Sequence, residues 1–538
     1  MKKAVVLILL CCLLATLLSC GGSNSTIVFI SPATATVNAG ATLQFTANVP
    51  VTWSVTGNGV IDAAGFFKAG NTAGTVTISA FATDGSRSSG TAIVTISTAG
   101  TSTTTTTAST PSGIIHRVFV SNKFSGVLNI VNADTDLLSA HSVSVGGLPT
   151  FMLQTSDLTV EVVYDSANNI LAFVNNKTEA VSIKISLAGA IKSAAIIPGA
   201  TAAYAAVPTA VATDSNGNSV TGAVFRADFS GGFLSVGVQG ARFISMDHNA
   251  VNMLAFSQNS DTVTLVTSSA GALTSSTGAL TAQPLPNSTT NCSATFSRPV
   301  AAVFSSDDHT AYVLSSGPVN GGTQAMVTVL DMTPSLLSSQ QVPPQVPPTL
   351  PTVVQCLNVS GANVGLLQGT QLYVAGASLT PCSSDATQTC QQAVLTVIDT
   401  STNKASSPVT FGQSAPNLVP GVLTFDGTNL WIGSTGCQVT AGALSCLSLY
   451  SPGNGQILTN PVPCISNTGS SCSLLTDQTD DVTGMVWLQP FNKREIMYVI
   501  EGGELLIYDN AFNLLTQNGS QIVVVDIIGQ AGDVKAVK

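Results

Sequence analysis

Few side chains in this sequence could carry out acid–base or nucleophilic chemistry. The chain contains only five Glu residues, and two of them, Glu501 and Glu504, flank Gly502-Gly503. Two carboxyl groups at this spacing could move protons to and from a substrate. A Gly-Gly pair between two apolar runs also predicts a tight hairpin turn. We therefore expect both carboxylates at an exposed hairpin tip rather than in an active site.

The remaining candidate groups form no recognisable motif. There are four His residues without H-E-x-x-H spacing, and the chain has no G-x-S-x-G, Walker or G-x-G-x-x-G sequence. We expect His248 and His309 in short, solvated turns. Residues 214–218 imitate the start of a calcium loop, but the sixth-position Gly is missing and Phe225 stands where the twelfth-position Glu belongs. The sequence therefore predicts no catalytic residue, no metal site and no cofactor.

Cysteine usage indicates an oxidising compartment. Of 11 Cys residues, Cys11 and Cys12 lie in an apolar leader and Cys20 follows it, which leaves an even set of eight. No C-x-x-C sequence occurs, so zinc and thioredoxin-like chemistry lack their usual signature. Three pairs are close in sequence, as is common for disulfides in exported proteins, and the last two cysteines pair by elimination. The predicted disulfides are Cys382–Cys390, Cys437–Cys446, Cys464–Cys472 and Cys292–Cys356, the last pairing being open from sequence; the alternative is free buried thiols.

The N-terminus has the pattern of an export signal. A short basic region precedes an apolar run over residues 4–18, which is shorter than the roughly 20 residues that span a bilayer. The sequence Leu17-Leu18-Ser19-Cys20 resembles the lipobox of bacterial lipoproteins. This resemblance implies removal of residues 1–19, lipid on Cys20 and a tether over residues 20–25; without Asp after the cysteine it favours the outer membrane or cell surface. The alternatives are an ordinary cleaved signal and an uncleaved anchor.

Residues 26–97 predict an all-β sandwich, because short runs alternate apolar and polar residues between Gly, Asn and Pro. The strand Val51-Thr52-Trp53-Ser54-Val55 and the later Gly65-Phe66-Phe67 resemble landmarks of the bacterial Ig-like domain, group 2. In that family the domain serves for spacing or adhesion, so the resemblance implies a stalk. Residues 98–113 are Thr-rich and predict an extended linker.

From residue 114 onward a unit of strand, Asp/Asn/Gly-rich turn, strand and further strand recurs. The clearest copy covers residues 162–176, with expected first and second strands on either side of the turn. The repeat resembles the YVTN-type β-propeller repeat, and its copies cover nearly all of residues 114–538. Second strands are expected near eight positions, which predicts eight blades, or seven if the weak copy near Tyr204 is not separate. They begin near residues 117, 170, 202, 252, 311, 371, 429 and 495.

The ring must also close. Residues 117–122 match a second strand but have no first strand before them, whereas residues 532–537 match a first strand. We therefore expect the C-terminal segment to complete the first blade. Most long insertions would then emerge on one face, which predicts a loop-rich binding surface for a protein or glycan ligand. These insertions are residues 208–222, 274–297, 316–323, 339–361, 377–391, 434–445 and 459–482.

Composition excludes several functions. Only 8% of the 538 residues are charged and the net charge is −10, so neither a nucleic-acid binder nor a charge-rich disordered chain is expected. The expected function is a non-enzymatic binding or adhesion module on an Ig-like stalk, anchored to a membrane through Cys20. The alternative is a propeller enzyme, lactonase-like or lyase-like, acting on a sugar-derived or acidic substrate. A third possibility is a purely structural envelope component.

Overall fold

The computed structural model divides the chain into two compact units, Met1–Ser102 and Thr103–Lys538. The predicted signal (1–19), Cys20, the tether (20–25), most of the linker (98–110), Cys464 and Cys472 lie outside the described residues. In the described part of the chain, no helix is long and apolar enough to cross a membrane. The structure describes residues 28, 30–31, 34–38, 42–72, 74–84, 88–97, 111–199, 201–257, 259–276, 278–287, 289, 292, 294–341, 344–382, 387–437, 444–461, 479–515, 527 and 531–537.

The first unit consists of short strands in three sheets. The largest has the order β2-β9-β8-β5, in which β2 and β9 are parallel; β3-β7-β6 and the pair β1-β4 complete the unit. Phe45, Phe67 and Ile78 are fully buried in its core, and alternate residues of β8 point into it. The strands are β1 (Ile30–Ser31), β2 (Thr34–Asn38), β3 (Thr42–Gln44), β4 (Thr46–Ala47), β5 (Val51–Thr56), β6 (Gly59–Ile61), β7 (Phe66–Ala69), β8 (Gly74–Ala82) and β9 (Ser89–Ser97).

The second unit is built from eight antiparallel sheets in its described residues, which we number 1 to 8 along the ring. Sheets 1 to 4 are, from the inner strand outward, β41 (Ala531–Val537), β10 (Arg117–Asn122), β11 (Val127–Asn132) and β12 (Leu137–Ser144); β13 (Pro149–Gln154), β14 (Val160–Asp165), β15 (Ile170–Asn175) and β16 (Ala180–Ser186); β17 (Ser193–Ile196), β18 (Ala202–Thr213), β19 (Ser219–Asp228) and β20 (Phe233–Gly237); and β21 (Ala241–Met246), β22 (Met253–Ser257), β23 (Val263–Ser268) and β24 (Leu280–Pro284).

Sheets 5 to 8 follow the same plan. They are β25 (Pro299–Phe304), β26 (Thr310–Ser315), β27 (Met326–Asp331) and β28 (Thr352–Asn358); β29 (Val364–Gln368), β30 (Gln371–Pro381), β31 (Thr389–Asp399), β32 (Lys404–Ala405) and β33 (Val409–Ala415); β34 (Val419–Phe425), β35 (Leu430–Thr435), β36 (Leu444–Ser451) and β37 (Gln456–Pro461); and β38 (Val482–Trp487), β39 (Ile496–Glu501) and β40 (Glu504–Asp509).

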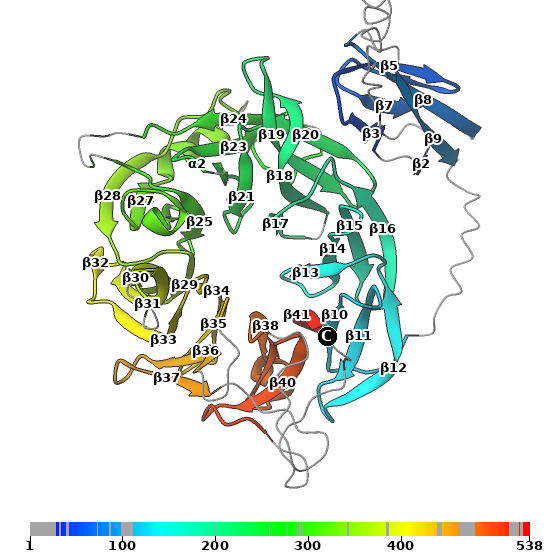
Figure 1. The fold of residues 1–538 in the computed structure, drawn as a ribbon. Helices are drawn as coiled ribbons and strands as arrows, with labels where there is room; N and C mark the ends of the chain where they lie inside the picture. Colours follow the sequence, from blue (N-terminus) through cyan, green and yellow to red (C-terminus); the bar gives the residue numbers. More distant parts are fainter. Residues whose placement is uncertain are drawn as a thin grey trace, which may run out of the picture. The chain divides into compact units, whose positions relative to one another are not determined.

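The inner strands make a closed ring. Each contacts the inner strand of the next sheet in the order β41, β13, β17, β21, β25, β29, β34 and β38, and β38 contacts β41 again. Figure 1 shows the sheets arranged radially around this ring. The second unit is therefore a β-propeller, as the repeat predicts.

The ring closes through the C-terminal strand, as expected. β41 pairs antiparallel with β10, with Arg117 opposite Val537 and Val120 opposite Val534. Val534 and Val537 are buried, because β41 packs against β38 on one side and β13 on the other. Strands made early and late in the chain thus share one sheet.

The predicted strand order is wrong in sheet 2. β13 pairs with β14, and β14 pairs with β15, so Ile170–Asn175 is the third strand of its sheet and not the second. Both central strands are buried on both faces and carry continuous apolar runs, so the sequence pattern does not distinguish them. The inner strand β13 is only partly buried and includes Thr150 and Gln154, which weakens its signal.

The faces between neighbouring sheets form the core. Apolar clusters occupy the space between successive sheets all around the ring, and strands such as β10, β23 and β39 are buried along their whole length. Strands that are buried on both faces leave little room for charged side chains. This packing explains why only 8% of the residues are charged.

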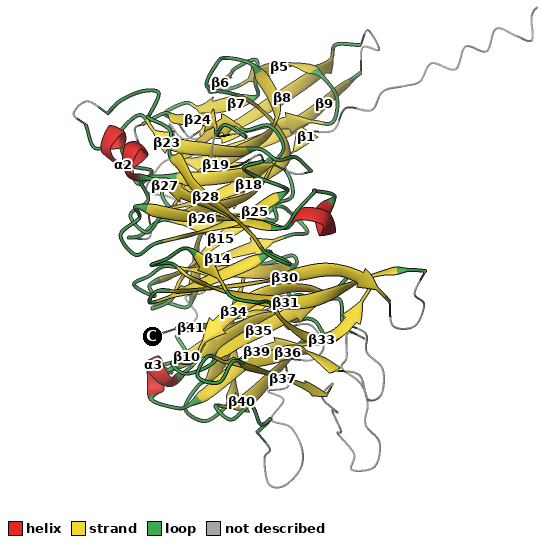
Figure 2. Ribbon diagram, turned by 90° about the vertical axis from the view of Figure 1, so that its left-hand side faces the viewer, coloured by secondary structure: helices red, strands yellow, loops and turns green. Residues whose placement is uncertain are grey.

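The two faces of the propeller differ in their connections. Turns between first and second strands, and α3 (Gln489–Asn492), lie on one face, which we call the turn face; α2 (Thr333–Ser339), between third and fourth strands, shares it. Second-to-third connections such as η1 (Gly317–Asn320) lie on the opposite face, as the edge-on view in Figure 2 shows. Two expected loops on that face, residues 208–222 and 377–391, are instead long hairpins formed by β18–β19 and β30–β31.

Three disulfides are present among the described residues. Cys382–Cys390 closes the tip of the β30–β31 hairpin, and Cys437–Cys446 links the segment after β35 to β36. Cys292–Cys356 ties the segment before β25 to the outer strand β28, with a Cα–Cα distance of 6.0 Å. These are three of the four predicted pairs.

Candidate functional site

A cavity of about 500 Å³ opens where the inner strands of sheets 4, 5 and 6 reach the turn face. β21, β25 and β29 run side by side there, and their last residues and following turns form the walls. Most of its lining side chains are apolar, but polar atoms make up more than half of the surface that faces the cavity. The lining residues are Met246, His248, Ala302, Val303, Phe304, Ser306, Gly365, Leu366, Leu367 and Gly369.

His248 is the ionisable side chain in this lining, and a buried carboxylate holds it. The contact from His248 Nδ1 to Asp308 Oδ1 is 2.7 Å; the imidazole is 60% exposed, whereas the carboxylate is 1% exposed. A carboxylate can only accept, so Nδ1–H donates and the lone pair of the neutral ring lies on Nε2. Nε2 forms no hydrogen bond or ion pair with a described residue and can therefore interact with a ligand.

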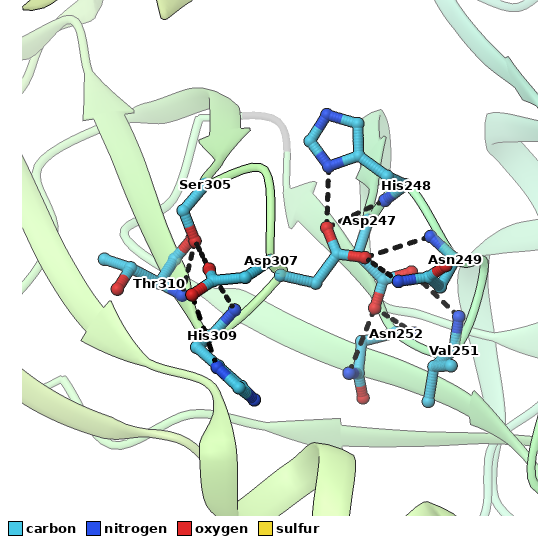
Figure 3. A network of polar contacts seen from close by, with 10 residues as sticks. Asp247, His248, Asn249, Val251, Asn252, Ser305, Asp307, His309 and Thr310 are labelled. Carbon is cyan, nitrogen blue, oxygen red and sulfur yellow. Dashed lines mark hydrogen bonds and ion pairs between the residues drawn. The ribbon is translucent and has the colours of Figure 1, made fainter. Parts of the chain in front are cut away.

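Asp308 itself is fixed by the turn that carries His248. Its two oxygens accept hydrogen bonds from the backbone N–H groups of His248 and Asn249, both at 3.0 Å, and from the Asn249 amide at 2.7 Å. Its φ of 60° lies in the left-handed region, which few residues other than Gly adopt without strain. Neighbouring sheets therefore supply the two halves of one His–Asp pair, and Figure 3 shows the two turns side by side.

Two further carboxylates organise these turns. Asp247 is buried and accepts hydrogen bonds from the backbone N–H groups of Val251 and Asn252, both at 2.8 Å. Burial raises the pKa of Asp247 to about 6, and the charge of Asp308 acts in the same direction. Asp307 is exposed, and the hydrogen bond from Ser305 Oγ, helped by the N–H of His309, lowers its pKa. Asp247 thus shapes the turn, while Asp307 remains an exposed anion.

The arrangement can do two things. An imidazole held through Nδ1 with a free Nε2 can bind a polar group of a ligand, or accept a proton as a general base. Among the described residues, no other ionisable group lines the cavity, and no set of three or more His, Cys, Asp or Glu side chains is arranged to hold a metal ion. Ligand binding therefore requires no additional ionisable group. Catalysis would depend on His248 as the one base, with water or a group of the substrate as the nucleophile.

The predicted exposed tip at Glu501 and Glu504 is wrong. Glu501 is fully buried and Glu504 is 4% exposed. Glu501 accepts hydrogen bonds from Ser445 Oγ and Tyr508 Oη, both at 2.7 Å, and Asp480 lies next to it. Burial and the charge of Glu501 raise the pKa of Asp480 to about 9, and burial also raises the pKa of Glu501. The residues preceding β38 cover this hairpin, which a local pattern cannot indicate.

The other residues considered in the sequence, His309 and Asp214, do not line the cavity. His309 lies 3.4 Å from Asp307, on the same turn, and is exposed, as is His248; both lie in the short turns expected for them. The Asp214 carboxylate accepts the backbone N–H groups of Asn216 and Asn218 and so holds the tip of the β18–β19 hairpin.

Sequence reasoning missed the pairing of His248 with Asp308. The two residues are 60 positions apart in different repeats, and only the packing of sheets 4 and 5 brings them together. One signal was available: each residue lies in the turn that follows the inner strand of its repeat, and these turns of adjacent repeats are neighbours in a ring.

Comparisons with known proteins identify the fold and no family. No protein-family model matches the chain, and no curated protein matches it. Among solved structures, dihydro-heme d1 dehydrogenase NirN in complex with DHE is similar at a TM-score of 0.50 and 7% identity, over 79% of this chain and 76% of NirN.

Two further solved structures are more distant. The periplasmic gluconolactonase PpgL of Pseudomonas aeruginosa has a TM-score of 0.41 and 12% identity, over 79% of this chain and 99% of PpgL. The Cps50 (Swd1) β-propeller domain of Myceliophteria thermophila has a TM-score of 0.40 and 10% identity, over 66% of this chain and 93% of that domain. At these identities neither similarity indicates a function for this chain, and the β-propeller fold rests on the ring of sheets described above.

Proposed function

We propose that this chain is an exported, lipid-anchored envelope protein whose β-propeller binds a ligand without converting it. The export and anchoring part rests on the lipobox-like sequence ending at Cys20, and the stalk part rests on the Ig-like pattern of residues 26–97. The observation that supports binding is the cavity of about 500 Å³ between β21, β25 and β29. Its mixed polar and apolar surface and the oriented imidazole of His248 suit a small ligand that carries polar groups beside an apolar part.

This proposal places the principal site on the turn face. The loop-rich face was the expected place for a protein or glycan ligand, whereas the cavity of about 500 Å³ lies among first-to-second turns. The cavity between sheets 4 and 6 admits a small molecule, one sugar unit of a glycan or one protruding side chain of a protein. Each of these three ligand types agrees with the proposed function of a membrane-anchored binding module.

Binding is tested by filling the cavity. Ala302→Phe adds a ring to its wall, so ligands found by thermal-shift and calorimetric screening of the full chain in detergent should bind at least ten-fold more weakly. A matched control is Val354→Phe, which adds a ring at an exposed position of the outer strand β28. Equal affinities of Ala302→Phe and wild type for every ligand would overturn this location of the site.

The anchor is tested separately. Intact-mass measurement of the mature protein should show a chain that begins at Cys20 and carries lipid, and Cys20→Ser should release the protein from the membrane fraction. Finding the same membrane association for Cys20→Ser and wild type would overturn the lipid anchor and leave the binding test unaffected.

The His248–Asp308 pair favours a second candidate, a propeller hydrolase of a sugar-derived or acidic substrate. Nε2 of His248 would take a proton from water as the water oxygen attacks the substrate carbonyl, and would return that proton to the departing oxygen. His248→Gln separates the two functions. Turnover of lactone or ester substrates that is lost in His248→Gln supports the enzyme; absence of turnover in the wild type, with ligand binding retained, supports the binding module.

A further inference from the structure

A second cavity, of about 310 Å³, lies between sheets 7 and 8 on the turn face. One wall is the turn between β34 and β35; the other combines the end of β38, α3 and the residues flanking β39 and β40. Unlike the cavity between sheets 4 and 6, it is lined mainly by polar side chains. The lining residues are Asp426, Gly427, Thr428, Asn429, Trp487, Gln489, Glu495 and Asn510.

The polar groups of this lining are held in place but only partly used. Asn429 Oδ1 accepts a hydrogen bond from Ser451 Oγ at 2.8 Å, which leaves both N–H bonds of its amide for a ligand. Asn510 Nδ2 donates to Glu495 Oε2 at 2.8 Å, which orients both side chains and leaves Asn510 Oδ1 and Glu495 Oε1 as acceptors. The lining therefore offers a ligand both hydrogen-bond donors and hydrogen-bond acceptors.

Asp426 has a supporting role. Its Oδ1 accepts the backbone N–H groups of Thr428 and Asn429, at 2.8 and 2.6 Å, and its Oδ2 accepts the indole N–H of Trp431 at 2.8 Å. The carboxylate is buried and anchors the turn to the core of sheet 7. Thr428 and Asn429 are consequently presented on a rigid turn, which lowers the entropy lost when they bind a ligand.

Trp487 supplies the aromatic part of the wall. It is the last residue of β38, is 8% exposed and packs in the cluster that joins sheets 6, 7 and 8. An aromatic surface beside amide and hydroxyl groups is complementary to a ring that has C–H bonds on its faces and hydroxyl groups at its edge. A sugar ring has this shape and this distribution of polarity.

Charge narrows the ligand further. The lining contains no Lys, Arg or His, and Glu495 is its one exposed carboxylate. An anionic ligand would meet a like charge with no cation to compensate, whereas a neutral polyhydroxylated ligand can use every free donor and acceptor. We propose that this cavity binds a neutral sugar ring, such as the terminal unit of a glycan. This site does not depend on the cavity between sheets 4 and 6.

The test uses the full chain with methyl glycosides of glucose, galactose and mannose, read by saturation-transfer NMR and calorimetry. At least one glycoside should bind, and the double variant Gln489→Ala/Asn510→Ala should bind it at least ten-fold more weakly. Both side chains are exposed, so this variant keeps the fold. Gln413→Ala, at an exposed position of β33, is the matched control and should bind as the wild type does.

Trp487→Phe and methyl glucuronide complete the test. Trp487→Phe keeps an aromatic side chain and should retain part of the affinity, whereas Trp487→Ala should lose it; thermal unfolding shows whether each variant is folded. Methyl glucuronide should bind more weakly than methyl glucoside because of Glu495. No binding of any neutral glycoside, unchanged binding in the double variant, or tighter binding of the glucuronide would overturn the proposal.

Discussion

Arg494, which precedes β39 in sheet 8, forms a two-pronged ion pair with Asp136 in the turn between β11 and β12 of sheet 1. The contacts are 2.6 Å from Nη1 to Oδ1 and 2.7 Å from Nη2 to Oδ2. Arg494 also donates to the carbonyl of Ala133, and Tyr498 donates to Asp136. The hydrogen bond to Asp136 raises the pKa of Arg494. Sheets 8 and 1 are thus joined by a directional ionic contact beside the apolar one.

Asp136→Asn should destabilise the propeller by about 2 kcal/mol, because it leaves a half-buried guanidinium with a weaker partner; this value lies between those typical of exposed and of buried pairs. Urea unfolding measures the change. Asp134→Asn is the matched control, since the exposed Asp134 pairs with the partly exposed His116 and should contribute less than about 0.5 kcal/mol. Equal losses in the two variants would contradict a special role for the Arg494 contact.

Stability should fall as pH rises from about 5 to about 9. Burial raises the pKa of Glu161 to about 8, against the opposing charge of Lys535, and burial with the charge of Glu501 raises that of Asp480 to about 9. In this range the folded state binds more protons than the unfolded chain, so the stability present at low pH is lost as the pH passes through the folded-state pKa values. The expected loss, measured by urea unfolding, is at least about 2 kcal/mol.

Neutral isosteres identify the groups responsible. Glu161→Gln and Asp480→Asn should each flatten part of the pH dependence, because an amide has no proton to lose. Asp214→Asn, at an exposed turn where hydrogen bonds from Asn218 lower the pKa of the carboxyl, should leave the profile between pH 5 and 9 unchanged. A double variant of Glu161 and Asp480 with the full wild-type slope would show that other groups titrate.

The disulfides should differ in their contributions. Loop entropy assigns about 4 kcal/mol to Cys292–Cys356, with a sequence separation of 64, and about 2.5 kcal/mol to Cys382–Cys390, with a separation of 8. Paired Cys→Ser variants compared by urea unfolding should show this order. Intact mass before and after reduction should correspond to four disulfides, including the predicted Cys464–Cys472. A mass change of three pairs or fewer would contradict the fourth bridge.

The sequence predicted the fold well where a strand carried its own signal. β22, β26 and β35 are apolar runs next to Asp- or Asn-containing turns, and β41 was identified because β10 lacked a first strand. The assignment failed in sheet 2, where β14 and β15 are buried alike and β13 carries a weak pattern. Strand order within a sheet depends on pairing partners, which local periodicity does not identify.

The candidate site could not be predicted in the same way. His248 and Asp308 each read as an ordinary turn residue, and their pairing exists only because sheets 4 and 5 are adjacent. The sequence predicted that Glu501 is exposed, because Asp480, which covers it, belongs to a different segment. The pairings Cys382–Cys390 and Cys437–Cys446 were predictable, because their short loops restrict the possible partners. A site formed by two repeats can be predicted only when the packing of those repeats is known. A disulfide within one hairpin can be predicted from the sequence alone.

The pairing of β10 with β41 has a consequence for the order of events in the cell. A chain is synthesised from its N-terminus, so residues 117–122 exist long before residues 531–537. During that interval β10 has an unpaired inner edge, and unpaired edges invite association with other chains. The ring has no closed form until β41 has been made, so a prematurely terminated chain would keep this edge open. The ring can therefore close only after β41 has been translated.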